Sequence, residues 1–172
     1  ETIRAKEKRG SLLWVLDKTK TAMGARLLRN YIEQPLIEKD EMEKRLDAIQ
    51  ELNQDSISRD EIREYLNPIY DLERLLSKVT YKTANPRDLI AFRNSLEMLP
   101  YIKDILGEFS CELLKKMNED LDPLRDLYEL IDRSIVDEPP ISLREGNIIK
   151  DGYSEEADKY RKAKTEGKAW LG

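Results

Sequence analysis

The chain of 172 residues contains no histidine and a single cysteine, Cys111. Without histidine, the sequence excludes Ser-His-Asp triads and histidine zinc sites, and it lacks the commonest general base near neutral pH. A lone cysteine excludes an internal disulfide framework and is typical of a reducing compartment. We therefore expect a cytoplasmic protein without disulfide bonds.

Long apolar stretches and phosphate-binding loops are missing as well. The longest purely apolar run extends from Leu12 to Leu16, far short of the ~20 residues that cross a bilayer. The string Gly-x-x-x-x-Gly-Lys-Ser/Thr, whose backbone cradles phosphate groups, does not occur. No signal peptide and no initiating methionine are visible, and the sequence stops just after large apolar residues. We expect no membrane span, and we expect both ends to be cut from a longer protein.

Glycine and proline are scarce, at seven residues each, and helix-forming residues dominate a composition that is 40% hydrophobic and 38% charged. Valine, threonine and phenylalanine, which favour strands, are sparse. The pattern predicts an all-α fold, an irregular helical bundle with long kinked helices. A small non-helical or β excursion is expected near residues 137–152, as two short strands or an ordered loop.

Charge is unevenly distributed along the chain. The first thirty residues carry eight basic and three acidic side chains, a net charge of +5, whereas the whole chain carries −5, so residues 31–172 carry −10. Such a basic segment is typical of an arm near nucleic acid or an acidic neighbour, or of a solvated entry segment. Apart from Trp14, no aromatic residue interleaves with these charges as on single-strand-binding surfaces, which favours the solvated segment.

Capping residues mark where helices are expected to begin. Thr21, Asp40 and Ser58 each provide a side-chain oxygen at the start of an amphipathic segment. Asn85 and Asp122 are each followed by proline, the arrangement of an N-cap and the first helical residue. These positions predict the starts of five helices.

Apolar spacing indicates which helix faces are buried. Residues 11–17 predict a short buried helix. In the helix that follows residue 40, the predicted inward side chains are Met42, Leu46, Ile49 and Leu52. Between Pro86 and Leu106, apolar residues keep their helical phase across Pro100, so we predict one long helix with a kink rather than a stop.

Few groups in the sequence could carry chemistry. The carboxylates around Glu51 and Glu119 fit magnesium ligands or an acid–base pair, and they equally fit helix caps or a solvated face, which we favour. Arg26 and Arg29 fit a phosphate site or an ion pair between helices or between domains, and we favour the ion pair. Cys111 has no activating cation beside it in the sequence. We assign no catalytic, cofactor-binding or metal-binding residue to this chain.

A further signal comes from motifs that run through the whole chain. The opening motif consists of Asp17, Thr19, Thr21, Gly24, Arg26-Leu27-Leu28 and Pro35-Leu36. Later motifs are Asp71-Leu72-Glu73-Arg74-Leu75, Glu138-Pro139-Pro140, Glu145-Gly146 and the segment from Ile148 to Tyr153. In this order, the motifs resemble the core domain of the MutS family of DNA mismatch repair proteins.

The resemblance implies that residues 1–172 are the first part of a single core domain, before an inserted DNA clamp, and that residues 153–172 start a lever helix. It implies a non-catalytic connector that couples the clamp to an ATPase, with ATP and Mg²⁺ bound elsewhere in the intact protein. The implied partners are double-stranded mismatched DNA, a second subunit and the other domains of the same chain, in the bacterial cytoplasm. The residues that match the structural motifs of the family are Gly24, Arg26, Asp71, Arg74, Pro139, Gly146 and Gly152.

Two alternatives stay open at this point. The chain also fits the core of a MutS2-type anti-recombination protein, which lacks the mismatch-binding domain, or a free-standing helical adaptor without an ATPase. An enzyme in its own right is disfavoured, since the sequence presents no acid–base or nucleophile constellation. The full reading frame would distinguish these possibilities.

Overall fold

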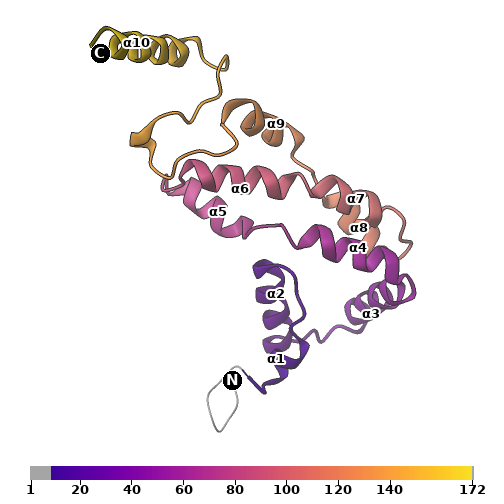
Figure 1. The fold of residues 1–172 in the computed structure, drawn as a ribbon. Coiled ribbons are helices and arrows are strands. Elements are labelled where there is room, and N and C mark those ends of the chain that lie inside the picture. The colour runs from indigo at the N-terminus through magenta and orange to yellow at the C-terminus, as the bar shows by residue number, and fades with distance from the viewer. Residues whose placement is uncertain (1–8, 172) are drawn as a thin grey trace. The chain divides into compact units, whose positions relative to one another are not determined.

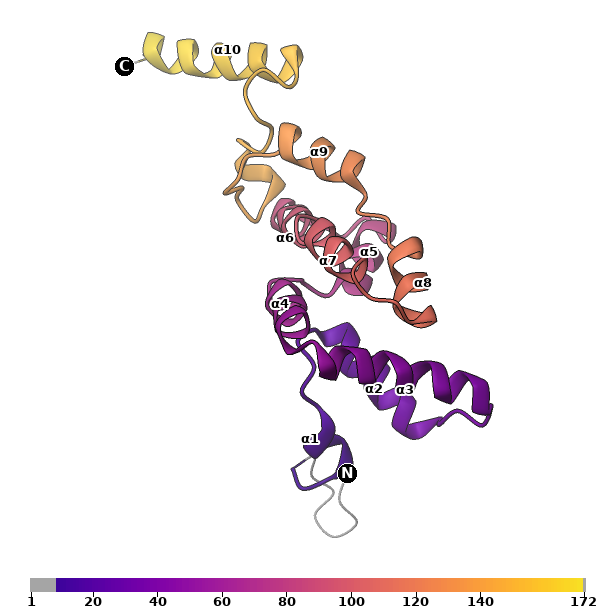
Figure 2. The same cartoon turned by 90° about the vertical axis from the view of Figure 1, so that its right-hand side faces the viewer.

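A computed structural model describes residues 9–171, with side chains described as far as residue 163. This part of the chain forms ten α-helices and one short 3-10 helix, η1, and its one β-type contact is an isolated bridge between Ile135 and Ile149. The predicted all-α fold is confirmed (Figure 1; Figure 2). The elements are α1 (Leu12–Leu16), α2 (Ala22–Glu33), α3 (Lys39–Gln54), α4 (Ser56–Leu66), α5 (Leu72–Thr80), α6 (Pro86–Leu96), α7 (Leu99–Leu106), α8 (Glu112–Asp120), α9 (Arg125–Ser134), η1 (Leu143–Glu145) and α10 (Glu155–Leu171).

The helices pack into two compact units. The first unit holds the described part of residues 1–74 together with residues 94–123, and the second holds residues 75–93 and the chain from residue 124 onward. Each unit has its own cluster of buried apolar side chains. That the whole chain is one core domain stays a prediction. Within the described residues, no helix is long and apolar enough to cross a membrane.

The core of the first unit gathers around α3 and α8. Its buried side chains are Ala48, Phe109 and Leu114. Tyr65 of α4 and Tyr101 of α7 stack nearly parallel, with ring centroids 5.0 Å apart, an arrangement that stabilises beyond the apolar area it buries. The partly buried side chains packed against this core include Leu52, Ile62, Ile105, Leu106 and Leu113.

The single kinked helix predicted across Pro100 is wrong, because the chain forms two helices there. α6 ends at Leu96, and α7 begins at Leu99 with Pro100 in its first turn. Pro100 has no N–H to donate to the Leu96 carbonyl and its ring crowds that carbonyl, so the first helix stops. Leu96 is 1% exposed, and beside it the fully buried Ser95 accepts a hydrogen bond at Oγ from the Tyr70 backbone N–H at 3.0 Å.

Of the four side chains predicted to point inward from α3, only Leu52 packs against the core. Ala48 is buried and Leu52 packs on the core, whereas Met42, Leu46 and Ile49 are 39%, 62% and 54% exposed. Ala48 and Leu52 lie one turn apart, and the small alanine side chain lets α3 approach its neighbours closely. We call Met42, Leu46 and Ile49 the exposed stripe of α3. The helix predicted to be buried over residues 11–17 is also corrected, because α1 has no buried residue.

Two of the predicted caps are confirmed by hydrogen bonds. Thr21 Oγ1 accepts a hydrogen bond from the Gly24 backbone N–H at 3.0 Å. At α6, Asn85 Oδ1 accepts from the Asp88 N–H at 2.9 Å, and the Asn85 N–H donates back to Asp88 Oδ2 at 3.0 Å. The reciprocal pair satisfies two backbone donors that a helix start leaves open.

The other three predicted caps are wrong. α3 begins before Asp40 and has no capping side chain. Ser58 lies inside α4, and the cap is Asp55, whose Oδ1 accepts a hydrogen bond from the Ser58 N–H at 3.0 Å. α9 begins at Arg125 rather than after Asp122. Since several acceptors stand within a few residues of each start, spacing alone does not select the one that caps.

In the second unit, residues 137–152 form an ordered loop, as one of the two predicted alternatives has it. The Val136 N–H donates to the Ile148 carbonyl and the Lys150 N–H to the Ser134 carbonyl, both at 2.9 Å. The 3-10 helix η1 lies within this loop. The buried core of the unit consists of Ile90, Ile131 and Ile135, with Leu89, Phe92 and Ile148 packed against it.

Arg93 of α6 ties this loop to the helices of the second unit. Its side chain is 13% exposed, and Nη1 donates to Asp132 Oδ1 at 3.0 Å and to Asp137 Oδ1 at 2.7 Å. Lys150 Nζ lies 3.5 Å from the same oxygen of Asp137. The hydrogen bond from Arg93 and the charge of Lys150 hold the pKa of Asp137 below its usual value.

Glu51 of α3 caps a different helix, α8, from across the first unit. Its carboxylate accepts hydrogen bonds from the Ser110 hydroxyl, from the Ser110 N–H at 3.1 Å and from the Cys111 N–H at 3.0 Å. These donors, first the Ser110 hydroxyl and then the Cys111 backbone, lower the pKa of Glu51 from 4.5 to about 2. The ionised carboxylate therefore stabilises the start of α8.

Replacing Glu51 with glutamine is expected to destabilise the chain in a pH-dependent way. A lowered pKa stabilises the folded chain above the unfolded value of 4.5, and this contribution disappears as pH falls toward about 2. The difference in free energy of unfolding between the unchanged chain and Glu51→Gln, measured with urea, should therefore be constant near neutral pH and shrink below pH 4.5. Glu61→Gln, at an exposed position of α4, is the control, and a pH-independent difference for Glu51→Gln would contradict the capping role.

Candidate functional site

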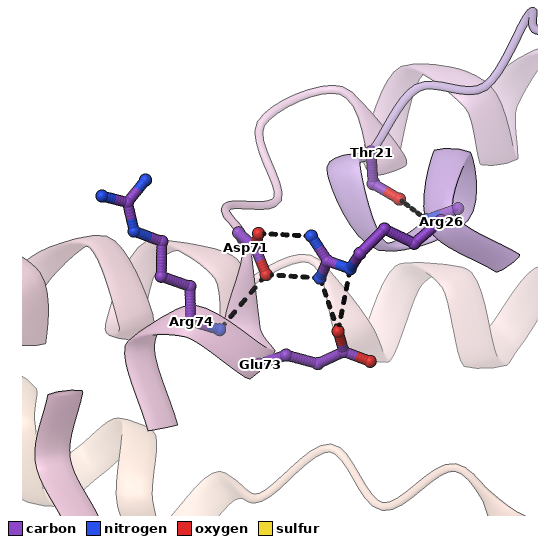
Figure 3. Close-up of polar contacts among 6 residues, drawn as sticks. Thr21, Arg26, Asp71, Glu73 and Arg74 are labelled. Carbon is purple, nitrogen blue, oxygen red and sulfur yellow. Dashed lines mark hydrogen bonds and ion pairs between the residues drawn. The ribbon is translucent and has the colours of Figure 1, made fainter. Parts of the chain in front are cut away.

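Arg26 of α2 forms hydrogen bonds and ion pairs with Asp71 and Glu73, at the start of α5 (Figure 3). Nη1 donates to Asp71 Oδ2 at 2.7 Å and Nη2 to Asp71 Oδ1 at 2.8 Å, a two-pronged pairing of guanidinium and carboxylate. Nε donates to Glu73 Oε2 at 3.1 Å, and Nη2 donates to the same oxygen. We call these three residues the Arg26 cluster, and they connect two helices that are far apart in the sequence.

Asp71 also caps the start of α5. Its Oδ1 also accepts a hydrogen bond from the Arg74 N–H at 3.2 Å, three residues on, as an N-cap carboxylate does. The hydrogen bonds from Arg26 lower the pKa of Asp71, and the two carboxylates raise the pKa of Arg26. The Arg74 guanidinium points away from the cluster (Figure 3). One carboxylate thus anchors α2 and starts α5.

Gly24 stands two residues before Arg26 and fits a crowded position. A Cβ atom there would lie 3.1 Å from Thr21 Oγ1 and 3.5 Å from Thr19 Cβ. Because the same Thr21 oxygen caps α2 through the Gly24 N–H, a larger side chain would displace the cap. Glycine therefore helps to fix the start of α2, and with it the position of Arg26.

The cluster is a structural tie rather than a reaction site. All three nitrogens of the Arg26 guanidinium donate to carboxylates, so the predicted ion pair between helices is confirmed in place of a phosphate site. For Arg29 the ion pair differs from the prediction, because Arg29 pairs with Glu33 inside α2 at 2.9 Å. Glu51 and Asp55 are helix caps, as favoured. Among the described side chains, no group of three or more candidate metal ligands gathers.

The remaining motif residues, Pro139, Gly146 and Gly152, belong to the second unit, where their backbone atoms carry the contacts. The Pro139 carbonyl accepts a hydrogen bond from Arg87 Nε at 3.0 Å. Gly146 ends η1. Gly152 has a φ of +81°, which only glycine adopts without strain, and its N–H donates to Asp158 Oδ2 at 2.9 Å. The seven motif residues therefore divide between the two units, four in the first and three in the second.

Sequence reasoning missed ties whose partners are distant along the chain. Lys103 Nζ donates to the carbonyls of Asn118 and Leu121 at 2.5 and 2.6 Å, which satisfies the C-terminal end of α8. The ties that Arg93 and Glu51 make were missed in the same way. No period in the sequence marks such pairs, because each depends on how two helices pack.

Replacing Arg26 with glutamine is expected to lower the thermal midpoint of the chain by about 2–4 °C. The change removes four donations and leaves Asp71, whose side chain is 22% exposed, without its counter-charge. Arg29→Gln is the matched control, because Arg29 pairs with Glu33 of its own helix and both side chains are well exposed. Equal shifts in the two variants, measured by circular dichroism on heating, would refute the tie between α2 and α5.

An apolar groove of about 450 Å³ also lies in the first unit. Its walls come from α2, α4, α7 and α8, and one acidic side chain, Asp120, stands among them. The groove and the exposed stripe of α3 are two accessible apolar surfaces of the first unit. The lining side chains include Met23, Leu66, Leu99, Ile102 and Met117.

Comparison with known proteins adds the family. Residues 1–169 match the family model of MutS domain III. Proteins named DNA mismatch repair protein MutS are similar to the chain over 99% of its length: 65% identity over 171 residues in Lachnoclostridium phytofermentans, 57% over 171 in Caldanaerobacter subterraneus subsp. tengcongensis and 55% over 170 in Halothermothrix orenii. The matched region is 18%, 20% and 19% of these relatives, so the chain spans about a fifth of their length. With an all-α fold and a family match over nearly every residue, the chain belongs to the MutS domain III family.

Proposed function

We propose that this chain is the helical framework of a bacterial DNA mismatch repair protein, in which it couples a DNA clamp to an ATPase. The observation that carries the proposal is the match of residues 1–169 to MutS domain III. The name shared by the relatives, DNA mismatch repair protein MutS, supports the mismatch repair branch over an anti-recombination protein or a free-standing adaptor.

The contacts of the described residues fit a framework. The Arg26 cluster, the cap from Glu51 and the tie from Arg93 all join helices to one another or to a loop. Exposed apolar surface, in the groove and on the stripe of α3, fits packing against other segments of a longer protein. A framework needs both stiff internal ties and such packing surfaces.

The partners follow from the same proposal. In the intact protein we propose double-stranded mismatched DNA, a second subunit and the neighbouring domains as partners, with the protein in the cytoplasm. The chain lacks a phosphate-binding loop, so its residues do not fit ATP and Mg²⁺, and we propose that these bind in another domain. No residue of this chain is given a catalytic role.

The experiment compares Arg26→Gln with Arg29→Gln in the full-length protein that contains this chain. Three quantities are measured: mismatch binding, ATP turnover without DNA, and the stimulation of ATP turnover by mismatched DNA. We expect Arg26→Gln to keep the first two and to reduce the third, because the DNA and ATP sites lie elsewhere while their coupling depends on the framework. Unchanged stimulation would contradict the connector role, and so would a mismatch preference of the 172-residue chain alone.

A further inference from the structure

The described part of α10, residues 155–163, buries little apolar surface within the second unit. None of its described side chains, residues 155–163, is buried. Three of them are half-buried, Ala157, Asp158 and Arg161, and Tyr160 is 69% exposed. A cavity of about 380 Å³ remains between α10 and residues 145–149. The hydrophobic effect therefore contributes little to holding this part of the helix in place.

Polar contacts around Arg161 take the place of apolar packing. Arg161 Nη1 donates to Asp151 and, at 2.9 Å, to Asp158 Oδ1, while Nη2 donates to the Ile149 carbonyl at 2.7 Å. Asp158 also accepts a hydrogen bond from the Gly152 N–H at 2.9 Å. We call these contacts the Arg161 latch. Two of the three half-buried side chains of α10 are members of the latch.

The latch spans a turn that can act as a pivot. Gly152, with its φ of +81°, begins the three residues that separate the bridged segment around Ile149 from α10. On one side of this turn, Ile149 is paired with Ile135, next to the end of α9. On the other side α10 is a regular helix. Rotation at the turn would move α10 as one body, and the latch opposes that rotation.

We propose that α10 is a latched arm: the Arg161 latch fixes its direction relative to α9, and opening of the latch frees the arm to pivot at Gly152. The forces that hold the latch are ionic, and Asp151 is 87% exposed, so salt weakens them. A carboxylate or phosphate group that competes for Arg161 opens the same contact. The inference rests on contacts within this chain and not on the role proposed for the domain.

The test measures the distance between spin labels at two exposed positions, Glu129→Cys in α9 and Lys162→Cys in α10, in a Cys111→Ser background. The chain with an intact latch should give one narrow distance distribution at low salt. Arg161→Gln removes the donations to Asp151, Asp158 and the Ile149 carbonyl and should broaden and shift the distribution. Arg161→Lys, which keeps the charge without the planar guanidinium, should lie between. Salt near 1 M should broaden the distribution of the intact chain.

Arg133→Gln is the matched control, because Arg133 is an exposed arginine of α9 outside the latch, and its distribution should stay narrow. A narrow distribution for Arg161→Gln, or a broad one for the intact chain at low salt, would overturn the proposal. Circular dichroism checks that Arg161→Gln keeps its helix content. If it does not, the salt series on the intact chain decides, and a distribution unchanged by salt would overturn the latch.

Discussion

Replacing Leu96 with alanine is expected to lower the free energy of unfolding by about 2–5 kcal/mol, the range for a large-to-small change in a packed core. Leu96 is 1% exposed at the end of α6, where Pro100 stops the helix. Removal of its isobutyl group leaves a cavity. Because Pro100 restricts the backbone next to the end of α6, the surrounding residues cannot easily move to fill it. Urea denaturation followed by circular dichroism measures the loss.

Leu46→Ala provides the comparison, since it is the same chemical change on a helix at a position that is 62% exposed. We expect a cost below about 1 kcal/mol there, because little apolar area returns to water. Equal losses at the two positions would mean that Leu46 is covered in solution. The exposed stripe of α3 would then have to be reconsidered.

Replacing Arg93 with glutamine should destabilise the second unit by roughly 1–3 kcal/mol, the cost of removing a charged hydrogen-bonding partner from a poorly solvated site. The side chain is 13% exposed and serves Asp132 and Asp137 together. Because Arg93 keeps the pKa of Asp137 below 3.8, this stability is fully present above that pH and is lost as pH falls further. Amide hydrogen exchange at Val136 and Lys150, whose backbone bonds close the loop, reports the change.

Arg133→Gln again serves as the control, with the same loss of charge at an exposed position of α9. It should leave the exchange of Val136 and Lys150 unchanged. If both variants accelerated exchange equally, net charge rather than the tie from Arg93 would explain the effect.

Those features of the fold that depend on neighbours in sequence were predictable. Thr21 and Asn85 cap helices through atoms three residues away, so both lie within reach of a local pattern, although the same pattern chose Ser58 where Asp55 is the cap. The inward face of α3 was not predictable, because two apolar faces compete and the choice depends on α8, which lies some sixty residues further along the chain. The helix break at Pro100 was missed because the apolar residues keep the same helical spacing on both sides of it.

The candidate site shows the same division. Gly24, Asp71 and Arg74 were singled out by a family resemblance. Arg26 was also expected to form an ion pair, but no local pattern named its partner, since Arg26 and Asp71 stand 45 residues apart. The helical spacing of the apolar residues around Arg26 predicts that Arg26 lies on a helix, but it does not predict which side chains Arg26 contacts. Only the packing of α2 beside the start of α5 turns these residues into a cluster.

The double use of Asp71 has a consequence for motion. Fraying of the first turn of α5 pulls the carboxylate away from the Arg74 N–H and, at the same time, disturbs its grip on Arg26. Conversely, a displacement of α2 moves Arg26 and pulls on Asp71 Oδ1, the oxygen that caps α5. Fluctuations of the two helix starts are therefore correlated, because a displacement of either one changes the hydrogen bonds of the carboxylate that both share.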